Sequence, residues 1–169
     1  MEGKKVMQSF TTMSELVLPN DTNTLSNLMG GKLMYWMDIG AGLAAMKHCN
    51  AQVVTASVDN ISFAKPIKLG HILTIEAKVT RAFTSSMEVY LKVWGEDLKS
   101  QNRYLSNEAY FTFVALDEAG KPQPVPEIIP ETDNEMERFA GALRRRQLRL
   151  ILAGRMKAEE ATELKALFV

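Results

Sequence analysis

The sequence has a single cysteine, no net charge and no long apolar run, and each of these absences excludes something. Cys49 alone rules out an internal disulfide and a multi-cysteine metal site, which fits a reducing compartment. The 20 basic and 20 acidic side chains cancel, so overall charge favours neither nucleic acid nor membrane as a partner. No segment approaches the ~18 apolar residues of a membrane helix, and the first residues lack the apolar core of a signal peptide. We therefore expect a cytoplasmic, soluble protein.

Histidine is also scarce. His48 and His71 are the only two, and neither has a partner at metal-ligand spacing, so we predict structural or solvent-facing roles for both and no metal site. With 46% hydrophobic side chains among 169 residues, the chain has enough apolar material for the core of one globular domain.

The most prominent feature of the sequence is an apolar segment over residues 28–46, which predicts one long helix. Five apolar side chains recur at helical spacing, and further apolar side chains fill the other faces: Leu33, Met37, Ala41, Ala44 and Ala45, then Met34, Trp36, Ile39 and Leu43. A helix that is apolar all round is normally buried. Glycine is unfavourable inside a helix, so Gly40 and Gly42 indicate that a neighbouring backbone approaches this helix closely.

One acid, Asp38, lies inside this apolar helix. A buried carboxylate must be paired, hydrogen-bonded or protonated, because its isolated charge is strongly disfavoured away from water. Asp38 is therefore either a structural acceptor facing a wet groove or a general base or nucleophile whose pKa is set by burial. The residue types alone leave both interpretations open.

The chain before the helix predicts a strand over residues 6–18 and a turn over residues 19–23. Gly30 and Gly31 then open the helix and leave its first backbone amides approachable. The end of a helix that carries bare amides attracts negative charge, including an oxyanion. By itself, this glycine pair is a weak indication of a site.

After the helix the pattern changes to strands. A strand-like run covers residues 53–63, and three runs over residues 73–80, 87–94 and 105–113 alternate apolar and polar side chains. Three long strands in series, each with one polar face, predict an antiparallel sheet that the helix covers on one side. Residues 122–130 are interpreted as an extended linker. From Glu135 the helical period returns, with a shorter amphipathic segment over residues 158–168.

Several segments together closely resemble the hot-dog acyl-CoA thioesterases, in the cytosolic acyl-CoA hydrolase branch. They cover roughly residues 6 to 126 and comprise Leu18–Asn23, Gly30–Gly31, Trp36–Asp38, Phe63–Gly70 and Phe111–Ala115. The resemblance implies an α+β hot-dog fold, an antiparallel sheet wrapped around a long central helix. We place this domain at residues 1–126 and a linker with a C-terminal helical extension at residues 127–169.

The resemblance also implies hydrolysis of a fatty acyl-CoA to a free acid and CoA, with CoA as part of the substrate and no cofactor. Members of the family use an acid at the position of Asp38 and an asparagine at that of Asn23, contributed by two subunits or two tandem domains. One copy of the domain is present here, so the expected assembly is at least a homodimer, with a trimer of dimers as a further possibility. By itself, an asparagine at position 23 is more commonly a turn or helix cap than a catalytic residue.

We assign roles accordingly. Asp38 is the general base, or a nucleophile that forms an anhydride, and Asn23 orients the water or the carbonyl. The amides near Gly30, Gly31 and Lys32 face the developing oxyanion.

Candidate contacts to CoA are hydroxyl and guanidinium groups: Ser85, Ser86, Arg144, Arg145 and Arg149. Arginine binds phosphate well, although an arginine-rich run is more commonly a solvated helix face, and the serines are more commonly hairpin residues. Two rival functions are a non-catalytic acyl-CoA-sensing module and a hot-dog dehydratase. The first requires an output domain that the sequence does not show, and the second a histidine paired with an acid.

Overall fold

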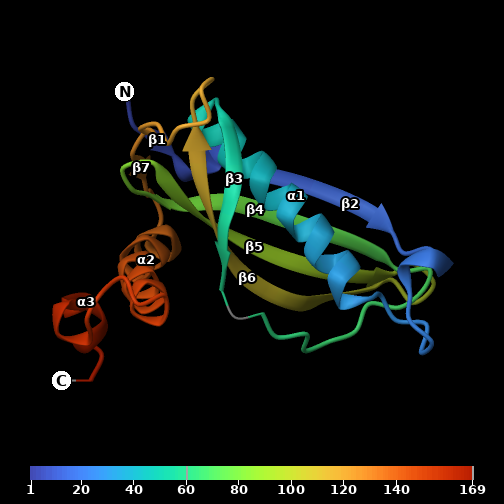
Figure 1. Cartoon of the computed structure of the whole chain (residues 1–169). Coiled ribbons are helices and arrows are strands. Elements are labelled where there is room, and N and C mark those ends of the chain that lie inside the picture. The colour runs from blue at the N-terminus through green and yellow to red at the C-terminus, as the bar shows by residue number, and fades with distance from the viewer. Residues whose placement is uncertain (60, 169) are drawn as a thin grey trace.

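The computed structural model describes residues 1–59 and 61–168. Its elements follow the chain in this order: β1 (Lys4–Lys5), η1 (Val6–Ser9), β2 (Thr11–Leu16), η2 (Pro19–Asp21), α1 (Gly30–Cys49), β3 (Gln52–Val58), β4 (Ile72–Ala82), β5 (Ser86–Asp97), β6 (Asn102–Leu116), β7 (Ile128–Ile129), α2 (Asp133–Leu152), η3 (Ala158–Glu160) and α3 (Thr162–Lys165). Long helix α1 crosses one face of the main sheet, while α2 lies on the other side (Figure 1).

The main sheet has five strands in the order β2-β4-β5-β6-β3, and every neighbouring pair is antiparallel. The alternation in β4, β5 and β6 has the predicted effect, because the apolar set of each strand is buried against α1. Strands β2 and β3 are the two edges of the sheet. In β3 the register shifts between Thr55 and Ser57, so this edge strand has a bulge opposite β6. The predicted antiparallel sheet over a central helix is confirmed.

Helix α1 packs into the sheet through small residues and larger apolar side chains. Ala41 and Met37 are fully buried. A Cβ at Gly40 would lie 3.1 Å from Cγ2 of Ile75 and 3.2 Å from Sδ of Met13, so the close approach of helix and strands requires glycine there. The helix ends at Asn50, whose φ of 52° is the left-handed conformation typical of helix ends.

The expectation that α1 is buried all round is wrong for a single chain. One side of the helix stays open to solvent, with side chains between 38% and 57% exposed: Met34, Tyr35, Ile39, Leu43 and Met46. Apolar side chains on every face predict burial but do not say which partner covers each face, because the pattern is the same whether that partner is the chain's own sheet or another surface.

Two other expectations need correction. Residues 6–18 are not one strand, because Val6–Ser9 form a 3-10 turn. Ser9 explains it, since its Oγ donates to the carbonyl of Val6 at 2.8 Å and accepts from the amide of Val79 at 2.9 Å. The stretch interpreted as a linker is packed as well, because Val125 and Ile128 are buried and β7 pairs in parallel with β1.

Towards the C-terminus, α2 is confirmed as a helix with a well-formed start. The hydroxyl of Thr132 accepts from the amide of Glu135, and the Glu135 carboxylate accepts from the amide of Thr132 in return. The predicted amphipathic segment over residues 158–168 contains η3 and the short α3. Position 60, within the predicted run 53–63, lies outside the described residues, and β3 ends before it at Val58.

Candidate functional site

Asp38 is solvent-exposed in the single chain, which corrects the prediction of a buried acid. Its neighbours Trp36 and Met37 are buried, whereas Asp38 itself lies on the side of α1 next to edge strand β3. There the hydroxyl of Thr55 donates to Oδ1 of Asp38 at 2.6 Å. Hydrogen bonds to a charged acceptor are short and directional, so Thr55 fixes the orientation of this carboxylate. Sequence reasoning missed Thr55.

Asn23 lies in the exposed turn between η2 and α1. Its Oδ1 accepts from the backbone amides of Leu25 at 2.9 Å and Asn27 at 3.2 Å, so the side chain does cap its own turn. Oδ1 is thereby held in place, which leaves the side-chain NH₂ group to donate elsewhere. Within the described residues no acceptor is recorded for it.

The start of α1 is uncapped, as the glycine pair predicts. Met29 is the N-cap residue and provides no side-chain acceptor. Asp21, which sequence reasoning did not single out, is buried here; its Oδ2 accepts from the Leu18 amide at 3.0 Å, and Nζ of Lys32 lies 3.4 Å from its Oδ1. The side chain of Lys32 is therefore paired with Asp21. The backbone amides of Gly31 and Lys32 lie at the exposed start of the helix, where they can bind an anion.

One chain does not bring these groups to a single point. Gly30 and Asp38 are about two helical turns apart, roughly 12 Å along the axis. Asn23 belongs to the end of the molecule at Gly30, because its turn closes through a bridge between Thr22 and Leu28. The Asn23 turn and the open helix end thus form one half of the predicted site, and Asp38 with Thr55 forms the other.

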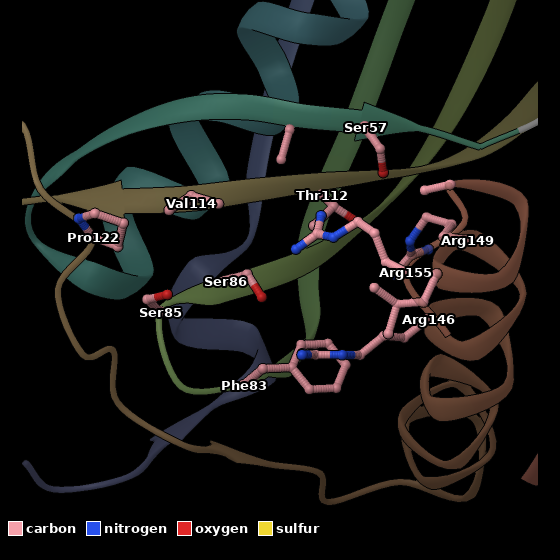
Figure 2. A pocket seen from close by; sticks show the side chains of 13 residues that line it. Ser57, Phe83, Ser85, Ser86, Thr112, Val114, Pro122, Arg146, Arg149 and Arg155 are labelled. Atoms are coloured by element: carbon pink, nitrogen blue, oxygen red, sulfur yellow. The ribbon is translucent and has the colours of Figure 1, made fainter. Parts of the chain in front are cut away.

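On the opposite side of the sheet, a cleft of about 430 Å³ lies between β3, β5, β6 and α2. Figure 2 shows Ser85 in the turn before β5 and Ser86 at the start of β5, with Arg146, Arg149 and Arg155 on the α2 side. Two hydroxyl groups in its lining, Oγ of Ser57 and Oγ1 of Thr112, are buried and have no hydrogen-bond partner among the described residues. A cleft with spare donors and several guanidinium groups is suited to an anion.

The arginines of this cleft differ in how far they are neutralised. Arg149 donates to Asp59, with Nη1 2.8 Å from Oδ2. Arg146 and Arg155 have no ion-pair partner in the part of the chain that the structure describes. Burial, together with the nearby positive charges of Arg149 and Arg155, lowers the pKa of Arg146. A bound anion would relieve this repulsion.

The predicted CoA contacts divide into two groups. Ser85, Ser86 and Arg149 come together in the cleft, joined by Arg146 and Arg155, which sequence reasoning did not include. Arg144 and Arg145 are not part of its lining and instead line a smaller pocket of about 150 Å³ beside Arg138 and Tyr110. The alternative of a solvated arginine face is wrong for Arg145, which is bonded to the fully buried Glu88.

Both histidines have structural partners. The ring of buried His48 donates from Nε2 to the carbonyl of Pro126 at 2.7 Å, and Nδ1 of His71 lies 3.1 Å from the hydroxyl of Tyr104. Neither is paired with Asp38, which argues against a dehydratase. Among residues 1–59 and 61–168 there is no group of three potential metal ligands. None of the helices described is both long and apolar enough to pass through a membrane.

Comparison with known proteins agrees with the fold described above. The family model of the thioesterase superfamily matches residues 25–100. The uncharacterized acyl-CoA thioester hydrolase YkhA of Bacillus subtilis (strain 168) is 43% identical over 135 residues, which are 80% of this chain and 78% of that protein. The cytosolic acyl coenzyme A thioester hydrolase of Mus musculus is 39% identical over 140 residues, but these are 82% of this chain and only 37% of the longer mouse protein.

Solved structures agree as closely. An apo-hexameric acyl-CoA thioesterase is 40% identical with a TM-score of 0.87, covering 90% of this chain and 98% of that one. The acyl-CoA hydrolase of Staphylococcus aureus, in complex with butyryl-CoA, CoA and CoA disulfide, is 42% identical with a TM-score of 0.82, covering 89% and 94%. Further structures of that enzyme have alanine in place of one aspartate, one asparagine or one threonine. The chain belongs to the acyl-CoA thioester hydrolases of the thioesterase superfamily.

Proposed function

We propose that this protein hydrolyses acyl-CoA thioesters at a site where Asp38 of one subunit meets Asn23 of another. The observation that supports this proposal most directly is the hydrogen bond from Thr55 to Asp38. This bond orients an exposed carboxylate on the side of α1 that the sheet does not cover. A general base has to be oriented and must reach water, and this carboxylate meets both requirements.

The reaction follows from these groups. Asp38 takes a proton from water as the water oxygen attacks the thioester carbonyl carbon. The carbonyl oxygen becomes an oxyanion, which the amides of Gly31 and Lys32 stabilise at the open end of α1. When the tetrahedral intermediate collapses, the C–S bond breaks and the CoA thiolate receives the proton from Asp38. The products are a free fatty acid and CoA. Direct attack by Asp38, with an anhydride intermediate, is the alternative route.

A second subunit completes this site. The exposed apolar side of α1 next to edge strand β3 is a surface that water disfavours, and a copy of the chain related by two-fold symmetry would cover it. Such a copy would bring its own Asn23 turn and helix end towards Asp38. We propose a homodimer as the functional unit and a trimer of dimers as the full assembly, which the hexameric relative supports.

The substituted Staphylococcus aureus structures support the same three residues. The asparagine, aspartate and threonine replaced there have the same spacing along their chain as Asn23, Asp38 and Thr55 have here. The single cysteine and the cytosolic mouse relative support a cytoplasmic location. The protein chemistry proposed here requires no cofactor, because carboxylate, amide and backbone groups supply the base and the oxyanion donors.

The cleft behind the sheet is our proposed site for the phosphates of CoA. Ser85, Ser86 and Arg149 were expected there from the sequence, and the uncompensated Arg146 and Arg155 add the positive charge that a phosphate requires. Its unpartnered hydroxyl groups, on Ser57 and Thr112, are further donors to phosphate oxygen.

A mixed dimer tests the shared site. Homodimers of Asn23→Ala and of Asp38→Asn should both be nearly inactive, with at least ~100-fold lower kcat for the second because the base is lost. After random subunit exchange about half of the dimers are mixed, and each mixed dimer has one intact site, so about a quarter of all sites should recover wild-type turnover. Hydrolysis is measured after exchange is verified by co-purification of two tags. Activity that stays at the mutant level in verified mixed dimers would refute the shared site.

The phosphate site has a separate test. Arg146→Ala should raise KM for an acyl-CoA about tenfold and leave kcat nearly unchanged, because it removes binding energy remote from the reacting bond. The comparison substrate is an acyl-pantetheine thioester, which lacks the nucleotide and its phosphates. An equal change of KM with both substrates would place the CoA phosphates elsewhere.

A further inference from the structure

Glu88 is a charged residue with no exposed surface, on the outer face of β5 beneath α2. All the donors it needs surround it. The hydroxyl of Thr80 donates to Oε1 at 2.8 Å, and Arg145 donates from Nε to Oε2 at 2.9 Å and from Nη2 to Oε1 at 2.8 Å. Arg149 adds a longer contact to Oε2, at 3.4 Å. None of these atoms takes part in the proposed hydrolysis step, although Arg149 also lines the proposed phosphate site.

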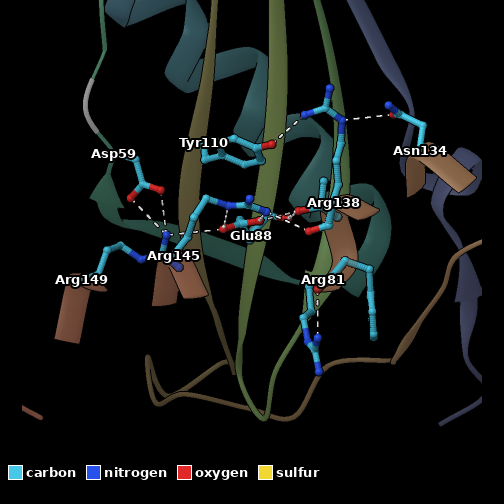
Figure 3. A network of polar contacts seen from close by, with 10 residues as sticks. Asp59, Arg81, Glu88, Tyr110, Asn134, Arg138, Arg145 and Arg149 are labelled. Atoms are coloured by element: carbon cyan, nitrogen blue, oxygen red, sulfur yellow. Dashed lines mark hydrogen bonds and ion pairs between the residues drawn. The ribbon is translucent and has the colours of Figure 1, made fainter. Parts of the chain in front are cut away.

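The same contacts extend to the segment after β3. Arg149 binds both oxygens of Asp59, at 2.8 and 3.1 Å, and so joins Asp59 to Glu88 (Figure 3). Two acids and two arginines therefore neutralise one another in a network that ties α2 to β5 and to the end of β3. Of the three arginines that line the cleft, Arg146 and Arg155 have no ion pair among the described residues.

Helix geometry links this network to the cleft. Arg145 and Arg149 are four residues apart and lie on one side of α2, so their bonds to Glu88 fix the rotation of the helix about its axis. Arg146 is the next residue after Arg145, about 100° further round, and its guanidinium lies 4.3 Å from the centre of the Phe83 ring at the edge of the cleft. Arg155 follows where α2 ends, with its amide bonded to the carbonyl of Leu150.

We propose that Glu88 is a positioning residue for CoA binding: through Arg145 and Arg149 it sets the rotation of α2 that points Arg146 and Arg155 into the cleft. This inference rests on the proposed phosphate site. It also accounts for an acid at a fully buried position, since an apolar contact would hold α2 on the sheet but would not fix its rotation, whereas paired charge-assisted hydrogen bonds are directional.

The test is Glu88→Gln, which keeps the size of the side chain and weakens its bonds to both arginines. We expect KM for an acyl-CoA to rise about fivefold or more, with kcat within about twofold of wild type and KM for the acyl-pantetheine unchanged. The matched control is Glu76→Gln. Glu76 is also paired with an arginine, Arg103, on the outer face of the sheet, but it bonds to neither Arg145 nor Arg149. This control should leave KM unchanged for both substrates.

Other outcomes separate this inference from the function on which it rests. An unchanged KM in Glu88→Gln while Arg146→Ala raises it would overturn the positioning role and keep the phosphate site. If KM rises in neither variant, both the positioning role of Glu88 and the phosphate site are overturned. Equal changes with both substrates would show a merely structural role. If Glu88→Gln does not fold, the double variant Glu88→Gln with Arg145→Gln replaces it, because it removes the charges in pairs, and the same expectations apply.

Discussion

The two long helices cover opposite sides of one sheet by different physical means. Helix α1 is held by apolar contacts: Met37 and Ala41 are fully buried, and Gly40 allows the strands to come close. Helix α2 is held largely by charge. Arg138 stacks on Tyr90 and Arg145 on Tyr110, with guanidinium carbons 3.5 and 3.8 Å from the ring centres.

The difference shows how each helix depends on its surroundings. Apolar burial is non-directional, proportional to area and insensitive to salt, so α1 is held firmly as part of the core. Ion pairs and cation–π contacts are directional, but they require their partners to be present, because a buried charge without its counter-charge is strongly disfavoured. Helix α1 is therefore a rigid support for Asp38. The position of α2 and of its arginines depends instead on the charged partners that hold it.

The largest effect should come from breaking the charged contact of α2 on one side only. Arg145→Met leaves the carboxylate of Glu88 buried with the hydroxyl of Thr80 and, as its charged partner, only the long contact to Arg149. It should lower the free energy of unfolding by about 3–5 kcal/mol. Adding Glu88→Leu should recover most of that loss. Urea denaturation of the two single variants and the double variant measures the coupling, and a loss below about 1 kcal/mol for Arg145→Met would contradict the ionic account.

Truncation in the apolar contact of α1 should be comparable or slightly smaller. Met37→Ala removes a fully buried side chain and should cost about 2–5 kcal/mol, depending on how far the surroundings collapse. Unlike the destabilisation by Arg145→Met, the destabilisation by Met37→Ala should be the same at low salt and in 1 M NaCl, because no charge is involved. A strong salt dependence of the Met37→Ala effect would remove the distinction between the two helices.

His48, a buried histidine near the end of α1, should give a smaller effect, through pH. Burial lowers the pKa of His48, and the positive charge of Lys4 adds to this, although the bond to the carbonyl of Pro126 opposes it. The unfolded chain therefore binds a proton near pH 6.5 when the folded chain does not. The free energy of unfolding should fall as the pH drops below about 6.5, by at most about 1.4 kcal/mol per pH unit.

Two variants distinguish the source of this slope. His48→Gln should remove it from the unfolding profile between pH 7 and 5, whereas His71→Gln, in which the histidine beside Tyr104 is replaced, should keep it. A slope that survives in His48→Gln would assign the effect to another group.

The smallest effect concerns the starts of the two helices, since α2 is capped by Thr132 and α1 is not capped by Met29. Thr132→Ala should destabilise by about 1 kcal/mol, and Thr132→Ser should restore most of the loss because it keeps the hydroxyl. Amide hydrogen exchange at the start of α2 provides the measurement. An unchanged exchange rate in Thr132→Ala would show that the cap contributes little.

The comparison between the helices also explains what the sequence could predict. Helical spacing in α1 and alternation in β4, β5 and β6 are local patterns with one dominant cause, apolar burial, and they gave the correct elements and the correct fold. The exposure of Asp38 could not be deduced, because an apolar helix face looks the same whether its own sheet or a second subunit covers it.

The missed residues depend on contacts between distant segments. Thr55 has no special spacing that marks it, and only the packing of β3 beside α1 reveals its bond to Asp38. The alternating run over residues 87–94 predicted a strand with one polar face, and Glu88 lies on that face. The sequence did not show that the arginines of α2 cover it. The signal that could have corrected this was an acid between the apolar residues Met87 and Val89, together with an arginine pair at helical spacing.

The bulge in β3 has a consequence for how this chain can change in evolution. Within three residues, this strand carries Thr55, which bonds to Asp38 on one face of the sheet, and Ser57, which lines the cleft on the other. Side chains two residues apart in a regular strand lie on the same face, so the extra residue of the bulge is what puts Thr55 and Ser57 on opposite faces. A regular strand of the same length would move one of them to the wrong side of the sheet. The bulge should therefore keep its position wherever both halves of the substrate are still recognised.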